Sequence, residues 1–166
     1  MLRVQQLMSQ NVHVCRPDDL VETAAKTMWE RDIGVVPVVE RDGRVIAMLT
    51  DRDVCMAALF KALPLSQIRV SEAMSRRLCT VRPEQPIEDA ELVLREHQVR
   101  RVPVVDGDGR LVGLLSQNDL VNEAAREREV RRKEITAVAV TATLADIGRS
   151  RAGGLVPASP AERNGL

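Results

Sequence analysis

The sequence predicts an α+β fold made of two β-α-β-β-α repeats packed face to face around a pseudo-two-fold axis. Three observations lead to this prediction. The chain matches itself when it is shifted by 66 residues, two copies carry the same continuous apolar run, and helical patterns flank each run. The match needs no gap between residues 4 and 54. The paired residues include Met8 with Met74, Pro37 with Pro103, Gly43 with Gly109, and Asp53 with Asp119.

Each repeat is expected to begin with a short strand followed by a helix. In the first copy the strand is residues 12–15, an apolar stretch that ends before an Arg-Pro pair. The helix is residues 19–31, because Asp19 and Glu22 have the spacing of a capping box and apolar residues recur at helical intervals. In the second copy Gln85 is expected to take the cap, with the following proline at the first helical position.

A hairpin and a second helix complete the predicted repeat. Residues 35–39 are a continuous apolar run, which indicates a strand buried on both faces. Pro37 within that run argues for an edge position or a local break in the strand. Gly43 is placed for a hairpin turn, and residues 44–49 return as the third strand. Residues 51–61 are then expected to form the second helix.

A single repeat is too small to bury a stable core, so the two copies are expected to form one folding domain with a shared core. The repeats are assigned to residues 3–62 and 69–125. A charged helical extension is expected over residues 126–151, where charges alternate in sign as on a solvated helical face. Residues 136–144 within it fit a strand or a helix equally well. Residues 152–166 are expected to form a disordered tail.

Composition narrows the classes of function. Lys plus Arg and Asp plus Glu each number 24, so the chain has no net charge to attract nucleic acid or an anionic membrane. Trp29 and Phe60 are the only aromatic residues, which leaves few platforms for stacking bases. No apolar stretch reaches the roughly 18 residues of a membrane helix. The three cysteines are widely spaced without a CxxC pair, which favours a reducing cytoplasm over a disulfide framework or a zinc site.

The end of each repeat carries a candidate binding motif. A strand is followed by a hydroxyl residue, two polar residues and an aspartate, with Thr50 and Asp53 in the first copy and Ser116 and Asp119 in the second. A carboxylate in the first turn of a helix can accept hydrogen bonds from both ribose hydroxyls, as in dinucleotide folds. The hydroxyl and the free amides of the helix can receive a phosphate. The same spacing is also that of an ordinary helix cap, and the two roles are compatible.

The whole pattern resembles the CBS domain, the module named from cystathionine β-synthase, in its usual tandem arrangement. The similarity covers about residues 3–125. The motifs that carry it are Arg16-Pro17-Asp18 and Arg82-Pro83-Glu84, Val36-Pro37-Val38-Val39 and Val102-Pro103-Val104-Val105-Asp106, and the two hydroxyl-x-x-Asp endings. The resemblance implies clefts between the repeats that bind AMP, ADP, ATP or S-adenosylmethionine as regulatory ligands, with no obligatory cofactor. It also implies a homodimer that signals to a protein partner.

Ligand-binding residues follow from the resemblance by position. Asp53 and Asp119 are expected to hold ribose, and Thr50 and Ser116 to contact ribose or phosphate. The adenine pockets are expected to be lined by Val14 and Thr80 and by the residues that precede each Pro-Val-Val strand, Val35 and Arg101. The binding turns also contain Arg52 and Asn118, so the two sites should differ in charge. Ala47 replaces the glycine of the pattern, and crowding by its methyl group makes the second site, with Gly113, the favoured one.

The sequence therefore predicts a non-enzymatic sensor of adenosine ligands. One alternative is a structural or dimerisation module in which the hydroxyl-x-x-Asp turns are caps only. An enzyme is disfavoured because no set of acid, base and nucleophile is present. His13 and His97 have no Cys, Asp or Glu at ligand spacing and are assigned structural roles. Nucleic-acid binding through residues 126–133 is a further alternative.

Overall fold

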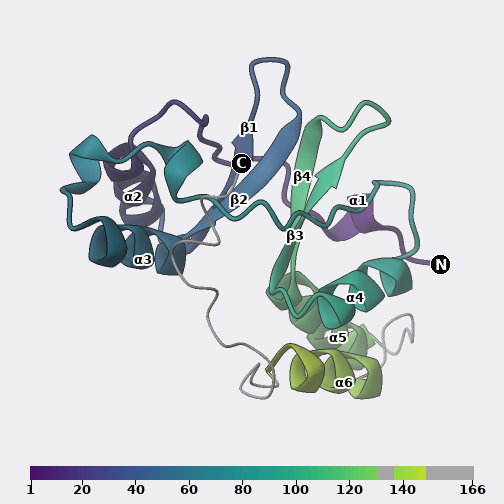
Figure 1. The fold of residues 1–166 in the computed structure, drawn as a ribbon. Helices are drawn as coiled ribbons and strands as arrows, with labels where there is room; N and C mark the ends of the chain where they lie inside the picture. Colours follow the sequence, from purple (N-terminus) through teal and green to yellow (C-terminus); the bar gives the residue numbers. More distant parts are fainter. Residues whose placement is uncertain (131–136, 149–166) are drawn as a thin grey trace.

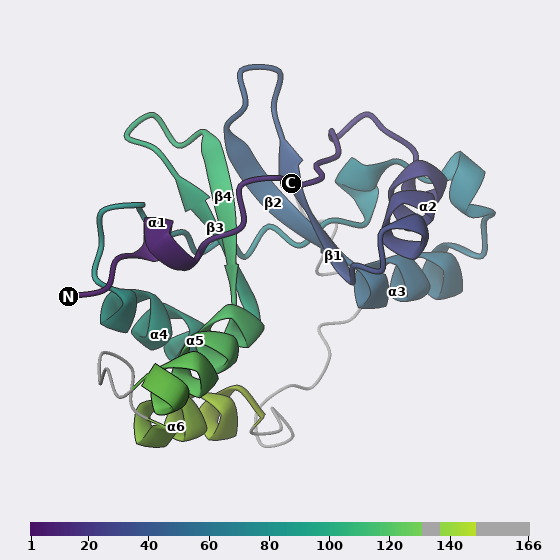
Figure 2. The ribbon, with the colours of Figure 1, turned by 180° about the vertical axis from the view of Figure 1, so that it is seen from behind.

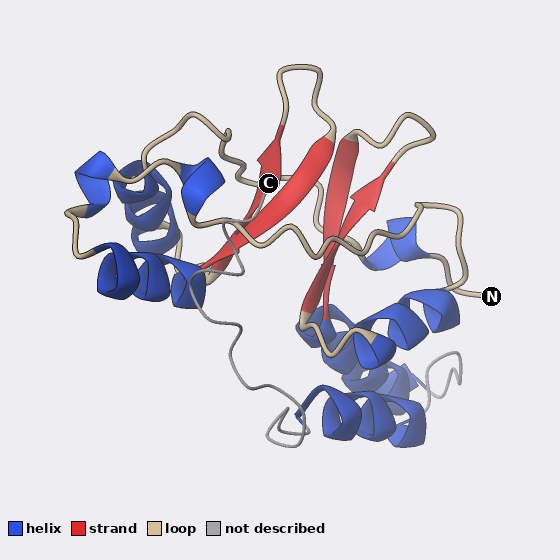
Figure 3. Cartoon of the chain, viewed as in Figure 1, coloured by secondary structure: helices blue, strands red, loops and turns tan. Residues whose placement is uncertain are grey.

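The structure is a computed structural model that describes residues 1–130 and 137–148. Two β-hairpins lie side by side at the centre, and the helices are gathered at the two outer ends (Figures 1 and 3). Each hairpin is a separate two-stranded antiparallel sheet. The tail predicted at residues 152–166 lies outside the described residues, as does part of the predicted extension.

Both repeats contain a helix, a hairpin and a second helix, in the predicted order. The last helix of the first repeat has the predicted bounds, and each third strand falls within one residue of its expected place. In the first repeat the elements are α2 (Val21–Glu30), β1 (Val35–Val39), β2 (Val45–Thr50) and α3 (Asp51–Lys61). In the second they are α4 (Ile87–Glu96), β3 (Arg101–Val105), β4 (Leu111–Ser116) and α5 (Gln117–Val130). Between the repeats lie the 3-10 turns η1 (Leu65–Gln67) and η2 (Val70–Glu72).

The strand predicted at residues 12–15 is wrong. Only Cys15 pairs, in a parallel bridge with Val38 of β1. The Cys15 amide donates to the carbonyl of Pro37 at 3.0 Å, and the Val39 amide donates to the carbonyl of Cys15 at 2.9 Å. The residues before Cys15 cross from one repeat to the other over the hairpins (Figure 2), and no strand pairs with residues 12–14.

The position of Pro37 explains why a proline is tolerated inside β1. Its carbonyl accepts from Cys15, on the side of β1 that faces away from β2. The nitrogen and oxygen of one strand residue point to the same side, so the missing N–H removes no bond between β1 and β2. The predicted edge position is confirmed, because each sheet has two strands. The strand is not broken, although its register shifts between Val38 and Val39.

The capping boxes predicted for the first helix of each repeat are wrong. Asp19 Oδ2 accepts from the amide of Arg16 at 2.7 Å, and Gln85 makes the equivalent bond at 2.7 Å. These side chains therefore close the turn before the helix. Val21 is the first residue of α2, and its amide donates instead to the carbonyl of the distant Ile68 at 2.9 Å.

The core of each repeat is completed by residues from the start of the other repeat in the sequence. The N-terminal segment, with α1 (Val4–Leu7), buries Leu2 and Val4 in the core of the second repeat. Ile68 and Val70 are buried in the core of the first repeat. Figure 2 shows the N-terminal segment starting beside α4 and crossing the hairpins before it reaches α2. The two repeats therefore depend on one another for their cores.

The core is divided differently from the prediction. Instead of one shared core there is a main cluster of buried side chains in each repeat, because the crossing segments fill each one. The cluster shared between the repeats is small and contains Val39, Val45 and Val105. The hairpins also join through main-chain bonds from Val45 to Gly109 at 3.1 Å and from Leu111 to Gly43 at 3.0 Å. Val45 is equivalent to Leu111 and Gly43 to Gly109, so the two bonds are related by the pseudo-two-fold axis.

A final helix, α6 (Ala137–Gly148), packs against α4 and α5. It occupies most of the stretch that the sequence left open between strand and helix. Val140 and Thr143 are buried, and Arg95 of α4 pairs with Asp146 at 3.3 Å. The described part of the predicted charged extension is thus partly a packed helix. None of the described helices is long and apolar enough to cross a membrane.

Candidate functional site

The hydroxyl-x-x-Asp turn of the second repeat joins β4 to α5. Asp119 Oδ2 accepts from both the amide and the Oγ of Ser116, each at 2.7 Å. The amide of Asp119 donates to Ser116 Oγ at 3.3 Å. These bonds fix the carboxylate at the start of the helix and leave its Oδ1 without a protein donor among the described residues.

The turn of the first repeat has the same geometry. Asp53 Oδ2 accepts from the Thr50 amide at 2.9 Å and from Thr50 Oγ1 at 2.7 Å, while the Asp53 amide donates to Thr50 Oγ1 at 3.1 Å. The capping role is therefore formed in both repeats. Because it uses one carboxylate oxygen only, capping does not prevent the other oxygen from holding a ligand hydroxyl.

A cavity of about 200 Å³ opens beside the second turn. Of the residues predicted to bind ligand, it brings together Val35, Arg101, Ser116 and Asp119. Val35 comes from the first repeat and the others from the second. The cavity therefore lies between the repeats, where the resemblance places the clefts.

The crossing segment adds wall residues that the sequence did not indicate. Ser9, Asn11 and His13 line the same cavity. His13 is exposed on this segment, not in the strand predicted for it. No local pattern marks these residues, because their position depends on the path of the chain between the repeats.

The remaining predicted residues lie elsewhere. Val14 lines a second cavity of about 250 Å³ together with Gly113, and Thr80 is exposed outside both cavities. Arg52 and Asn118 are exposed in their turns, and their side chains line neither cavity. The partly exposed Thr50 and Asp53 also lie outside these two cavities.

The difference between Ala47 and Gly113 has a structural explanation that does not involve a ligand. A Cβ on Gly113 would lie 2.6 Å from Met8 Sδ and 3.0 Å from the carbonyl oxygen of Ser9. Glycine is therefore needed for the close approach of the N-terminal segment. Ala47 is fully buried in the core of the first repeat, so the expectation that its methyl group crowds a ligand is not supported.

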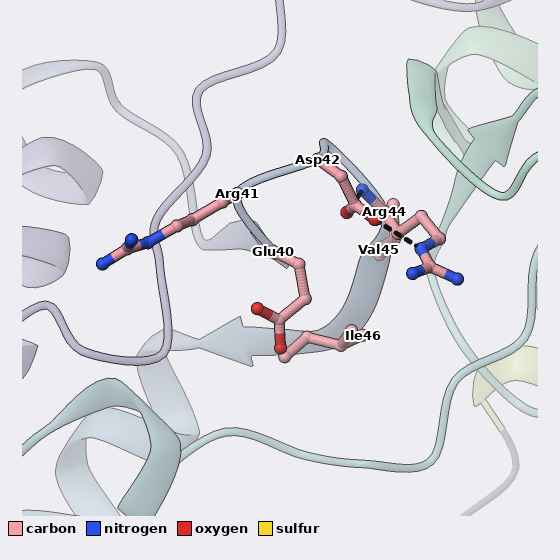
Figure 4. Close-up of a pocket in the computed structure, with 6 residues that line it drawn as sticks. All are labelled: Glu40, Arg41, Asp42, Arg44, Val45 and Ile46. Atoms are coloured by element: carbon pink, nitrogen blue, oxygen red, sulfur yellow. Dashed lines mark hydrogen bonds and ion pairs between the residues drawn. The ribbon is translucent and has the colours of Figure 1, made fainter.

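A cavity of about 630 Å³ lies along the turn of the first hairpin and the start of β2 (Figure 4). Asp42 and Arg44 form an ion pair within the turn at 2.7 Å, and Arg41 points away from them. The Arg44 backbone amide, with its guanidinium, lowers the pKa of Asp42. The walls of this cavity come from one hairpin only, and the cavity contains no hydroxyl-x-x-Asp turn. We therefore take the cavity beside Asp119 as the candidate site.

The thiols of Cys15 and Cys79 are not activated as nucleophiles. Burial, with a smaller contribution from the Asp19 carboxylate, raises the pKa of Cys15 to about 12. Burial also raises the pKa of Cys79. Both thiols therefore stay protonated near neutral pH and are poor nucleophiles. Within residues 1–130 and 137–148, no three His, Cys, Asp or Glu side chains are grouped to hold a metal ion.

Comparison with known proteins agrees with this architecture. The CBS domain profile matches the chain twice, over residues 4–59 and 70–126. The CBS domain-containing protein YhcV of Bacillus subtilis is 36% identical over 128 residues, which cover 76% of this chain and 89% of YhcV.

Two solved structures have the same fold. CBSX2 in complex with AMP has a TM-score of 0.67 and 27% identity, covering 80% of this chain and all of CBSX2. The CBS domain pair of MJ0100, in complex with 5′-methylthioadenosine and S-adenosyl-L-methionine, has a TM-score of 0.69 and 20% identity, covering 76% of this chain and 98% of that domain pair. The chain belongs to the CBS domain family and carries its domain twice, as a tandem pair.

Proposed function

We propose that this protein is a regulatory module that binds an adenosine ligand in the cavity beside Asp119. The observation that carries the proposal is the position of the Ser116–Asp119 turn on a cavity walled by both repeats. A ligand held there contacts both repeats at once. Its binding favours one relative placement of the repeats, and a protein partner that senses this placement is regulated in trans.

The class of ligand follows from the turn and from one relative. Ser116 uses only Oδ2 of Asp119, which leaves Oδ1 to accept from ribose hydroxyls, as acidic residues do in dinucleotide folds. CBSX2, at 27% identity, was solved with AMP. MJ0100 is too distant in sequence to lend more than its fold. AMP is therefore the first ligand to test, followed by ADP, ATP and S-adenosylmethionine.

A thermal-shift panel tests this function. A ligand that binds only the folded state stabilises it by about 2.7 kcal/mol at one hundred times its Kd. We expect at least one of AMP, ADP, ATP and S-adenosylmethionine to raise the Tm, and NAD and cyclic di-adenylate serve as larger adenosine probes. If none of the six shifts the Tm, the chain is the alternative structural module, with its Asp residues acting only as caps.

The proposed module is not an enzyme and acts in the cytoplasm. Serine, histidine and aspartate side chains line the cavity, but none of the hydrogen bonds among the described residues joins His13 to a serine or to Asp119, as a nucleophile and its base require. The cysteines, all free thiols, suit a reducing compartment. We expect ATP to be recovered unchanged after long incubation with the protein. Production of ADP or AMP in proportion to protein concentration would contradict the assignment.

We also propose that the protein forms a homodimer through the helices of its first repeat. Trp29 of α2 is 88% exposed, and Leu59 and Phe60 of α3 are 67% and 65% exposed. The equivalent helices of the second repeat, α4 and α5, are covered by α6. An uncovered apolar face of this kind is typical of an interaction surface.

Phe60→Asp is expected to shift the protein from dimer to monomer. A charge at this position must be desolvated when the face is buried, which opposes association. The mass measured by light scattering should fall by half at the same protein concentration. Leu92→Asp, on the exposed side of α4, is the matched control and should leave the mass unchanged. A Phe60→Asp protein that remains dimeric would place the interface elsewhere.

A further inference from the structure

The helix α6 covers the helices of the second repeat only. It lies against α4 and α5, on the side of them that faces away from the hairpins (Figures 1 and 2). Arg95 of α4 is in contact with it, through the ion pair with Asp146. At the equivalent position of the first repeat, Trp29 is exposed. A repeat can therefore be built without this cover, and α6 is an addition to the second one.

The contact that holds α6 is small. Among its described side chains, those of residues 140–146, only Val140 and Thr143 are buried. The side chains of Arg95 and Asp146 are 42% and 27% exposed, and an ion pair this open to water contributes little to stability. Few buried groups therefore favour the docked position of α6.

A buried carboxylate on α4 opposes this docking. Glu91 lies one helical turn before Arg95, on the same side of α4. Its Oε1 is buried and has no hydrogen-bond partner among the described residues. Burial, with a smaller contribution from Glu88, raises the pKa of Glu91. None of the described side chains of α6 carries a positive charge that could pair with it. Because an unpaired buried acceptor is costly, α6 is held by a small net free energy.

The helix α5 connects α6 to the cavity. Asp119 lies in the first turn of α5 and lines the cavity, which no described residue of α6 does. The next residue, Leu120, and Ala124 one turn later are buried in the same cluster of side chains as Val140 of α6. Since such clusters are closely packed, the position of the first turn of α5 affects the surface on which α6 rests.

We propose that α6 is the output element of this module: a ligand bound at Asp119 holds α6 on α4 and α5, and loss of the ligand releases it. The inference rests on the proposed function, because the ligand acts on α5 through Asp119. Release uncovers the faces of α4 and α5 that carry Glu91 and Arg95, and a partner in trans reads this change. By linkage, docking of α6 raises the affinity for the ligand by the same factor.

Hydrogen exchange of α6 measures its release directly. The helix has 12 residues, and a helix of this length is only marginally stable alone in water, so its amides exchange once it leaves the surface. In the natural chain we expect saturating AMP to slow exchange at residues 140–146 about fivefold or more. The helix α3, which carries no residue of the cavity, should slow much less. If AMP does not bind, the ligand that raises the Tm most among ADP, ATP and S-adenosylmethionine replaces it.

Val140→Asp tests the linkage from the other end. A charge at this buried position must be desolvated for α6 to dock, so the variant releases the helix. Its α6 should exchange fast with or without AMP, and calorimetry should show AMP binding about fivefold or more weaker than to the natural chain. Ala142→Asp places the same charge on the exposed side of α6 and is the matched control. It should bind AMP as the natural chain does.

Glu91→Ala changes the docking in the opposite direction. It introduces the residue that α2 has at the equivalent position, Ala25, and removes the buried acceptor that has no partner. Without ligand, exchange of α6 should become about tenfold slower than in the natural chain. Glu96→Ala, at an exposed position of the same helix, is the control and should change it little.

The outcomes separate this inference from the function on which it rests. Exchange of α6 that bound AMP leaves unchanged, or equal AMP affinities of the natural chain and a folded Val140→Asp, would overturn the coupling while the binding itself still supports the function. If circular dichroism shows Val140→Asp to be unfolded, the exchange of α6 in the natural chain decides. Unchanged or faster exchange in Glu91→Ala would overturn the weak docking that release requires. Failure of AMP, ADP, ATP and S-adenosylmethionine to bind at all would overturn the function and this inference together.

Discussion

Asp119→Ala is expected to abolish the rise in Tm that AMP produces in the natural protein. The substitution removes the Oδ1 acceptor that we assign to the ribose hydroxyls, and it releases Ser116 from its two bonds to Oδ2. At one hundred times the Kd, the lost stabilisation is about 2.7 kcal/mol. A thermal scan of the variant with increasing AMP measures it directly.

The same substitution also removes a helix cap, which lowers stability without ligand by about 1 kcal/mol. Asp53→Ala separates the two effects, because Asp53 makes the same bonds to Thr50 and lies outside the cavity. Both variants should lose a similar amount of stability without ligand, and only Asp119→Ala should lose the response to AMP. A full response in Asp119→Ala, or its loss in Asp53→Ala alone, would move the site away from Asp119.

Local pattern was sufficient for the elements whose residues interact with near neighbours. Residues 35–39 pair with the next strand across a short turn. The helix at residues 51–61 begins at a cap in which Thr50 and Asp53, three residues apart, bond to each other. Both are local interactions, and the prediction placed them closely. Repetition then transferred each element to the second copy.

Elements that depend on distant segments were predicted less well. Residues 12–15 have the composition of a strand, yet only Cys15 pairs with one, because the chain is crossing between repeats. Asp19 has the spacing of a cap, yet Val21 receives its partner from Ile68. Periodicity cannot show whether the first segment of a repeat packs into its own repeat or into the other one. Val4 and Val70 occupy equivalent positions, so either arrangement would bury the same kind of residue.

The candidate site shows the same division. Ser116 and Asp119 carry a recognisable motif, and the resemblance indicated Val35 and Arg101 beside them. His13 has no motif and joins the site only because its segment passes over the cavity. A residue of this kind is found from the fold, since its neighbours are distant in the sequence and belong to both repeats.

Val4→Ala is expected to destabilise the protein by about 2 kcal/mol and to loosen the second repeat. Val4 is fully buried among side chains of the second repeat, although it belongs to the first in sequence. Removing two buried carbon groups costs about 0.8 kcal/mol each, with a further term for the cavity. Hydrogen exchange should become faster in α4 and β3, while α2 and β1 change little.

Val70→Ala is the matched variant, because Val70 is equally buried in the first repeat and equivalent to Val4. It should loosen α2 and β1 instead, so the two variants give opposite patterns of exchange. Loosening of α2 by Val4→Ala would contradict the exchange of segments. The segment that carries Val4 continues into His13 on the wall of the cavity, so docking of this segment and binding of AMP should stabilise each other. AMP is therefore expected to slow exchange in α4 of Val4→Ala, because the ligand holds in place the segment whose anchor has been weakened.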